Sequence, residues 1–236
     1  MLTIIIPVYN QLEHTKITCK SLIESTKDFD LVMVDDGSTD GHTTYFQELS
    51  EKLGTRFHPI HCTENQGVNE AWNTGLRYAM RNLKNNYICI ANNDLHFTFD
   101  WDVNLIKALD SGYALVSPMS TEQSLPPDFP RGSTRHENPV HIEILGACFM
   151  FKKDLIDEIG YFPRQMRHYF GDNWIADFSK KKGHKIGHIQ DSYIHHYFCI
   201  TSSKLDNNHW FKVDGAAYDE LCANPKKYGY DAKEVV

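Results

Sequence analysis

The sequence predicts an α/β protein whose central sheet is mostly parallel and flanked by helices. Short apolar runs rich in β-branched residues alternate along the chain with amphipathic segments. Runs of the first kind form the buried strands of parallel sheets, and the amphipathic segments form the helices that connect them. Polar residues follow directly after several of the runs, at the edge where open α/β sheets bind their ligands. The 236 residues suit one large domain, or one domain with a small appendage.

The composition is typical of a soluble protein, since 41% of the residues are hydrophobic and 23% are charged. The net charge of −7 argues against a protein that mainly wraps nucleic acid, although it leaves room for a local basic face. The six cysteines lie far apart without a C-x-x-C pair, which indicates reduced thiols. The sequence contains no transmembrane run, and its apolar start at residues 1–8 is too short for a signal peptide. We therefore expect a cytoplasmic protein.

The first half of the chain predicts strands that alternate regularly with helices. Pro7 cannot donate a hydrogen bond to a sheet, so it marks the end of the first strand. Gly75 lies inside a predicted helix, where glycine costs about 1 kcal/mol relative to alanine, and close packing of that helix would explain it. The strands are expected over residues 2–8, 29–34, 56–61 and 87–92, and the helices over 11–25, 43–53 and 68–79.

The second half is less regular. We expect a loop over residues 95–99 and a substrate-facing or mobile loop over 119–139, which is rich in Pro, Ser and Thr. Gly146 and Ala147 interrupt an apolar strand, as happens where a backbone or a ligand comes close. The other strands are expected over 113–117, 141–151 and 185–189, the helices over 100–109, 152–159 and 172–182, and a last helix with a tail within 207–236.

Carboxylates and amides follow two of the buried strands. Asn92, Asn93 and Asp94 end the central strand. Asp94 is a hard oxygen ligand of the kind that holds a magnesium-like ion together with substrate phosphates. Asp36 lies farther from its strand than Asp35 and is the better placed to accept hydrogen bonds from a ligand. A polar turn or a helix cap is the alternative for each cluster.

For several other polar residues the sequence is consistent with both a functional and a structural role. Asp172 begins a predicted helix, where a carboxylate is a common cap. His195 and His196 follow a strand, and since adjacent strand side chains point to opposite faces, at most one of them faces a given site. Taken alone, Asn73 suits a solvated position on its helix.

Several short motifs follow one another in a specific order. They are Pro7-Val8-Tyr9-Asn10, Val34-Asp35-Asp36-Gly37-Ser38-Thr39-Asp40-Gly41, Asn65-Gln66-Gly67 with Ala71, Asn73, Gly75 and Ala79, then Asn92-Asn93-Asp94, Gly146-Ala147-Cys148 and Gly171-Asp172. Each motif is weak alone, but the ordered set over about residues 2–200 resembles glycosyltransferase family 2 with the GT-A fold.

The resemblance implies one GT-A domain over residues 1–200. It would consist of a Rossmann-like nucleotide-sugar half over about 1–95 and an acceptor and catalytic half over about 96–200. Residues 201–236 would then form a C-terminal helix and tail packed on the same domain.

The resemblance also implies a donor site. Asp36 would accept a hydrogen bond from the ring N–H of the base, and Asn73 would lie beside the nucleotide or the diphosphate. The nucleotide would be bound by Pro7, Val8, Tyr9, Asn10, Asp36, Asn65, Gly67, Asn73, Asn92 and Asn93.

The implied metal and catalytic residues depart in part from the family pattern. Asp94 and His196 would hold Mn²⁺ or Mg²⁺, with His195 as the rival of His196, and Asp172 would be the catalytic base. Asparagines 92 and 93 stand where the Asp-x-Asp metal motif of the family begins. Gly171 replaces the first acid of the family's Glu-Asp pair.

The resemblance implies a hexosyl- or pentosyltransferase that moves a sugar, with inversion, from a UDP-, dTDP- or GDP-sugar to an acceptor hydroxyl. A glycan or lipid-linked sugar is the favoured acceptor, and a modified base in nucleic acid is the alternative. Two rival functions stay open: a glycoside hydrolase, which also needs two carboxylates, and a catalytically weakened GT-A-fold module that binds sugar nucleotides. The base, the sugar and the oligomeric state do not follow from the sequence.

Overall fold

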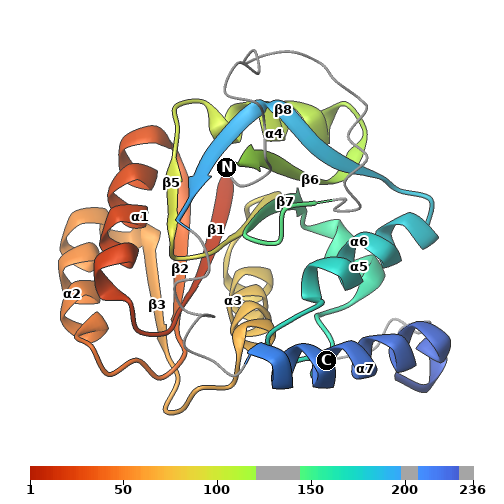
Figure 1. The fold of residues 1–236 in the computed structure, drawn as a ribbon. Coiled ribbons are helices and arrows are strands. Elements are labelled where there is room, and N and C mark those ends of the chain that lie inside the picture. Colours follow the sequence, from red (N-terminus) through yellow and green to blue (C-terminus); the bar gives the residue numbers. More distant parts are fainter. Residues whose placement is uncertain (121–143, 198–206, 229–236) are drawn as a thin grey trace.

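The computed structural model describes residues 1–120, 144–197 and 207–228. Its centre is an eight-stranded sheet with the strand order β3-β2-β1-β4-β7-β6-β8-β5 (Figure 1). The strands are β1 (Leu2–Val8), β2 (Phe29–Asp35), β3 (Phe57–His61), β4 (Tyr87–Ala91), β5 (Leu95–Phe97), β6 (Tyr113–Ser120), β7 (Cys148–Lys152) and β8 (Lys185–His196).

The sheet has a purely parallel part and a mixed part. β3, β2, β1 and β4 are parallel, and Val8 lies opposite Asp35, so β1 and β2 end at the same level. β7 then runs antiparallel to both β4 and β6, while β6 and β8 are parallel to each other. The carboxyl ends of β1, β2 and β4 therefore meet at one edge, beside the point where the strand direction changes.

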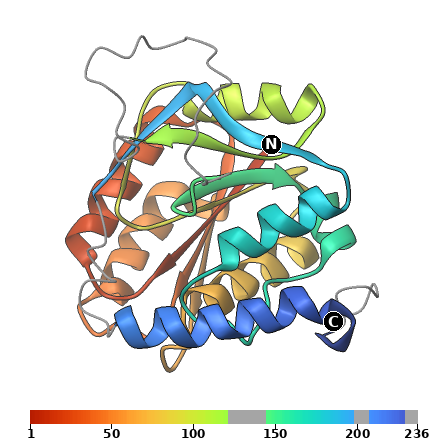
Figure 2. The ribbon, with the colours of Figure 1, turned by 45° about the vertical axis from the view of Figure 1, so that its right-hand side comes forward.

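Helices cover both faces of the sheet (Figures 1 and 2). α1 (Leu12–Ser25), α2 (His42–Leu53) and α4 (Trp101–Asp110) pack on one face, and α3 (Val68–Asn82), α5 (Asp154–Ile159), α6 (Gly171–Lys181) and α7 (Asn207–Ala223) pack on the other. Alternate strand side chains point to opposite faces, so Ile4 and Ile6 enter the first core and Ile5 enters the second. Short 3₁₀ turns span Gly54–Arg56 and Pro225–Tyr228.

Most predicted elements are confirmed with small shifts of their ends, but three predictions were wrong. Residues 95–97 form strand β5 and not a loop, because they pair with β8 and the hydroxyl groups of Thr18 and Ser21 accept hydrogen bonds from Leu95 N–H and Phe97 N–H. Of the strand predicted over 141–151, residues 141–143 lie outside the described residues, residues 144–147 form a turn, and strand β7 starts at Cys148. The short strand at 185–189 is the start of the long β8.

The loop predicted over 119–139 lies outside the described residues, apart from Met119 and Ser120, which extend β6. The close packing expected at Gly75 is confirmed, because a Cβ there would lie 2.4 Å from Ile5 Cγ2 on β1. In the described part of the chain, no helix is both long and apolar enough to cross a membrane.

Candidate functional site

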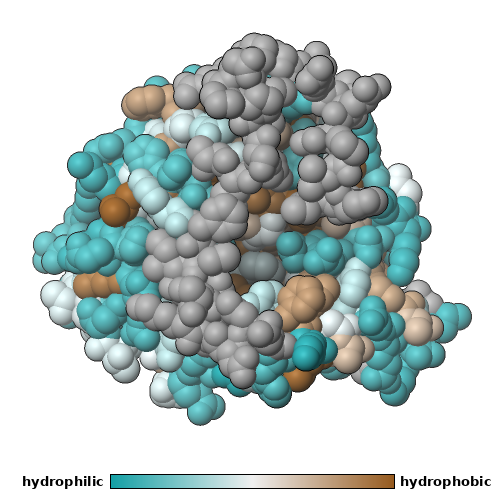
Figure 3. Space-filling model, in the orientation of Figure 1, coloured by the Kyte–Doolittle hydropathy of each residue, from teal (hydrophilic) through white to brown (hydrophobic). Residues whose placement is uncertain are grey.

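A cavity of about 370 Å³ opens at the carboxyl ends of β1, β2 and β4, where open α/β sheets bind their ligands. In the orientation of Figure 1, the molecular surface is hollowed near its centre (Figure 3). The residues that line the cavity are Pro7, Val8, Tyr9, Asp36, Asn65, Val68, Ala71, Trp72, Asn92, Asn93, Asp94, Gly146, His168, Tyr169, Phe170, Asp172, Asn173, His196 and Phe211.

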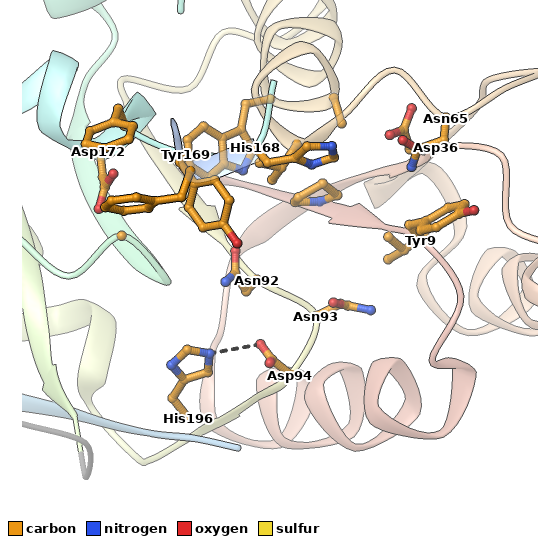
Figure 4. Close-up of a pocket in the computed structure, with 18 of the residues that line it drawn as sticks. Tyr9, Asp36, Asn65, Asn92, Asn93, Asp94, His168, Tyr169, Asp172 and His196 are labelled. Atoms are coloured by element: carbon orange, nitrogen blue, oxygen red, sulfur yellow. Dashed lines mark ion pairs between the residues drawn. The ribbon is translucent and has the colours of Figure 1, made fainter. Parts of the chain in front are cut away.

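Asp36 and Tyr9 lie at one end of the cavity (Figure 4). The two carboxylate oxygens of Asp36 accept hydrogen bonds from the backbone N–H groups of Gln66 and Gly67, each at 2.9 Å. Burial raises the pKa of Asp36, and the two N–H groups and the Arg167 guanidinium oppose that rise in part. Each oxygen keeps a lone pair, so Asp36 can accept a further hydrogen bond from a ligand.

Asp94 and His196 face each other along one side of the cavity, between its two ends (Figure 4). His196 Nε2 lies 3.2 Å from Asp94 Oδ1, which is buried and makes no hydrogen bond within the described part of the chain. Antiparallel pairing of β5 with β8 sets this meeting, because it places His196 opposite Leu95, the residue after Asp94. His195 does not line the cavity, and its ring contacts the ring of Tyr197. The structure therefore brings His196, and not its rival, to Asp94.

Asp172 lies at the end of the cavity opposite Asp36 (Figure 4). It is the second residue of α6, and Phe170 before that helix has the left-handed backbone conformation, with φ 61°. A Cβ on Gly146 would lie 2.3 Å from Asp172 Oδ2, so only glycine lets the turn before β7 come this close. Burial raises the pKa of Asp172, and the Asn173 N–H group opposes that rise in part.

The position before Asp172 has no room for a side chain. A Cβ on Gly171 would lie 2.3 Å from Asn69 Oδ1 and 2.7 Å from Trp72 Cζ3. Both atoms belong to side chains of the buried helix α3. Gly171 therefore stands where the family pattern has an acid, and the close packing of α6 against α3 leaves no room for an acidic side chain there.

Three of the residues predicted to bind the nucleotide do not line the cavity. Asn73 is buried, and its amide exchanges hydrogen bonds with Phe162, donating to the carbonyl and accepting from the N–H group. Asn10 Oδ1 accepts a hydrogen bond from Thr39 N–H. Gly67 acts through its N–H group, which donates to Asp36. The structure gives these three residues supporting contacts around the cavity.

The cavity wall formed by His168, Tyr169 and Phe170 was not predicted from the sequence. This segment is held from two sides, since Asn69 Nδ2 donates to the carbonyls of Met166 and Tyr169, and Asp214 accepts backbone hydrogen bonds from residues 167–169. Phe211 of α7 also lines the cavity, and its ring contacts those of Tyr169 and Phe170. The spacing of Asn69 and Asn73, one helical turn apart, was the one available signal.

The described cavity lining carries three carboxylates, Asp36, Asp94 and Asp172, and neither lysine nor arginine. Among the described residues, no group of three or more His, Cys, Asp or Glu side chains is arranged to hold a metal ion. A cation at Asp94 would therefore be held by one carboxylate, His196, neutral oxygens and the phosphates of a ligand. That donor set suits Mg²⁺ or Mn²⁺, which bind through one or two carboxylates and substrate phosphates.

The chain belongs to glycosyltransferase family 2, because residues 3–180 match the model of that family. It is 26% identical over 128 residues to undecaprenyl-phosphate 4-deoxy-4-formamido-L-arabinose transferase of Edwardsiella ictaluri, covering 51% of this chain and 37% of the relative. It is 34% identical over 109 residues to glycosyltransferase GlyA of Streptococcus pneumoniae, covering 46% of this chain and 15% of the relative. The chain thus spans well under half the length of either protein.

The fold is that of GT-A glycosyltransferases. A mannosyltransferase of Pyrobaculum calidifontis, solved in complex with GDP-Man and Mn²⁺, superposes with a TM-score of 0.70. The match covers 93% of this chain and 64% of the mannosyltransferase at 18% sequence identity. At that identity the likeness concerns the fold, and it confirms the α/β domain predicted from the sequence.

Proposed function

We propose that this protein is a glycosyltransferase that moves a sugar from a nucleoside-diphosphate sugar to an acceptor hydroxyl. The observation that carries the proposal is that one cavity holds Asp36 at one end, Asp172 at the other and the Asp94–His196 pair between them. Membership of family 2 and the transferases among its relatives support it. The base would bind beside Asp36 and Tyr9, the diphosphate beside Asp94, and the sugar toward Asp172.

The charge of the cavity supports a metal-dependent donor site. A diphosphate is repelled by nearby carboxylates unless a positive charge compensates, and the described lining contains no lysine or arginine. Asp94 and His196 would hold Mn²⁺ or Mg²⁺, and the mannosyltransferase of like fold was solved with Mn²⁺. When bound, the cation would neutralise the charge that develops on the leaving diphosphate.

Asp172 is the proposed general base. It would take the proton from the acceptor hydroxyl as that oxygen attacks the anomeric carbon of the sugar from the face opposite the diphosphate, which inverts the configuration. Burial favours the protonated carboxyl and therefore makes the carboxylate a stronger base than a solvated aspartate. Trp72 and Phe170 among the lining side chains would help to exclude water from the reaction.

The acceptor is proposed to be a glycan or a lipid-linked sugar. The name of the Edwardsiella relative includes undecaprenyl phosphate, a polyprenyl lipid, which supports an acceptor sugar carried on such a lipid. A nucleic-acid acceptor is less well supported, because the net charge is −7 and the Arg167 side chain is turned inward, where it donates to the Asn65 carbonyl oxygen at 2.6 Å.

The test is a transfer assay with UDP-, dTDP- and GDP-sugars, with Mn²⁺ or Mg²⁺, and with glycan and polyprenyl-linked sugar acceptors. The wild-type protein should release nucleoside diphosphate from one class of donor. Asp172→Asn should lower kcat by about 10²–10⁴-fold, because general base catalysis contributes that much. Asp154→Asn, which changes an exposed carboxylate in the first turn of α5, should leave kcat unchanged.

Two outcomes would contradict the proposal. If Asp172→Asn retained the turnover of the wild type, Asp172 would not be the base. If no donor and acceptor pair reacted while nucleotides still bound, the protein would be a binding module that keeps the GT-A fold.

A further inference from the structure

A buried chain of hydrogen bonds runs from a surface loop to Asn93. Asp40 Oδ1 lies 2.6 Å from His42 Nδ1, and His42 Nε2 lies 3.0 Å from the hydroxyl oxygen of Thr15. Asn93 Nδ2 donates to the same hydroxyl oxygen at 2.9 Å. His42 and Thr15 are 1% and 0% exposed, so water does not replace these contacts. None of the three supporting residues lines the cavity.

The Asp40 carboxylate determines which group donates and which accepts in each of these hydrogen bonds. A carboxylate can only accept, so His42 carries a proton on Nδ1. In the neutral ring Nε2 is then an acceptor, and the Thr15 hydroxyl donates to it. The oxygen of Thr15 is left to accept from the Asn93 amide. If His42 is protonated on both nitrogens, Thr15 can donate to the Gln11 carbonyl oxygen 3.4 Å away, and its oxygen still accepts from Asn93.

A second acceptor fixes the same orientation. Asn93 Nδ2 lies 3.5 Å from the carbonyl oxygen of Asn10. The reversed amide would put its oxygen against that carbonyl oxygen and lose the hydrogen bond to Thr15. With its nitrogen bound to α1, Asn93 presents its oxygen toward the middle of the cavity, and Figure 4 shows the nitrogen on the side away from Asn92.

The orientation of the Asn93 amide matters because asparagine and aspartate differ in the atoms that they can offer to a cation. An aspartate has two equivalent oxygens and offers one to a cation in either orientation. An asparagine has a single oxygen and offers an NH₂ group if it is reversed. An amide oxygen is a suitable ligand for Mg²⁺ or Mn²⁺, but an NH₂ group repels a cation. A site with an asparagine in place of an acid therefore needs an orienting contact.

We propose that Asn93 Oδ1 is a cation ligand beside Asp94, and that Thr15 and His42 are positioning residues that hold this oxygen toward the cavity. The inference rests on the proposed metal-dependent donor site and names the residue that supplies its second protein oxygen. Asp40 supports the arrangement twice, because its other oxygen accepts from Leu12 N–H at the start of α1, the helix that carries Thr15.

The experiment measures the Mn²⁺ dissociation constant by calorimetric titration in the presence of excess UDP or GDP, so it needs no turnover. Thr15→Val keeps the branched shape and removes the hydroxyl, and it should weaken Mn²⁺ binding about 10–100-fold, as loss of an orienting contact to a metal ligand does. Thr15→Ser restores the hydroxyl and should stay close to the wild type.

Two controls separate orientation from stability. Ser21→Ala removes a buried hydroxyl on the same helix that accepts from Phe97 N–H, and it should leave Mn²⁺ binding unchanged. Asn93→Asp supplies an oxygen in either orientation, so Thr15→Val should have little further effect on Mn²⁺ binding in that background.

The outcomes distinguish the inference from the function on which it rests. The orienting role of Thr15 would be overturned if Thr15→Val bound Mn²⁺ as tightly as the wild type. It would also be overturned if Thr15→Val weakened Mn²⁺ binding equally in the wild-type and the Asn93→Asp backgrounds. No Mn²⁺ binding by the wild-type protein with any nucleoside diphosphate would instead contradict the metal-dependent donor site.

Discussion

At the scale of single residues, Asp172 combines a functional advantage with a cost to stability. Its carboxyl is enclosed by the turn at Gly146 and the start of α6, and burial raises its pKa. A buried carboxylate gains basicity and loses hydration. The same environment that makes Asp172 a candidate base should therefore destabilise the folded protein whenever the group is ionised.

We predict that Asp172→Asn is more stable than the wild type at neutral pH. Since the folded pKa of Asp172 is raised above the unfolded value, the folded state binds the extra proton between the two pKa values, and wild-type stability falls as pH rises through that range. The asparagine has no charge, so its advantage should be largest at neutral pH and vanish near about pH 4, the ordinary pKa of aspartate. Urea unfolding at both pH values measures it. An advantage independent of pH would contradict this account of Asp172.

At the scale of elements, α7 and the segment before α6 act as one unit. Asp214 of α7 is fully buried and accepts hydrogen bonds from the backbone N–H groups of Arg167, His168 and Tyr169 at 3.0, 2.7 and 2.9 Å. α7 lies beyond the residues that match the family model. A helix outside the matched region therefore supports one wall of the cavity.

Asp214→Asn should lower the free energy of unfolding by about 1–3 kcal/mol, because its NH₂ group would face a backbone N–H donor and leave it without a partner. Asp219→Asn, at an exposed position of the same helix, should cost less than about 0.5 kcal/mol. Urea unfolding of the two variants makes the comparison. Equal stabilities would show that the hydrogen bonds of Asp214 do not hold the wall.

The elements also show where sequence reasoning succeeds and where it fails. The strands β1, β2 and β4, which end at or directly before Val8, Asp36 and Asn92, were predictable, because buried parallel strands are continuous apolar runs that are followed by polar residues at the ligand-binding edge. β5 was missed because its three residues depend on β8, a hundred residues away along the chain, for their pairing. The 168–170 wall was missed for the same reason, since Asn69 and Asp214 hold it through long-range contacts.

At the scale of the whole molecule, the site lies where the parallel part of the sheet meets its mixed part (Figure 1). β1, β2 and β4 deliver Tyr9, Asp36 and Asp94, whereas the second half of the chain delivers His196 and Asp172. All five of these residues were predicted site residues in the sequence, but only the fold places them around one cavity. We propose that this cavity binds a nucleoside diphosphate together with a divalent cation.

The most direct test is thermal unfolding of the protein with UDP, dTDP, GDP or CDP, each with Mn²⁺, with Mg²⁺ and with a chelator. A ligand that binds only the folded state stabilises it, by about 2.7 kcal/mol at a concentration of 100 Kd. We predict that one nucleotide raises Tm with Mn²⁺ or Mg²⁺ and raises it far less with the chelator. An unchanged Tm with every nucleotide and metal would contradict the account.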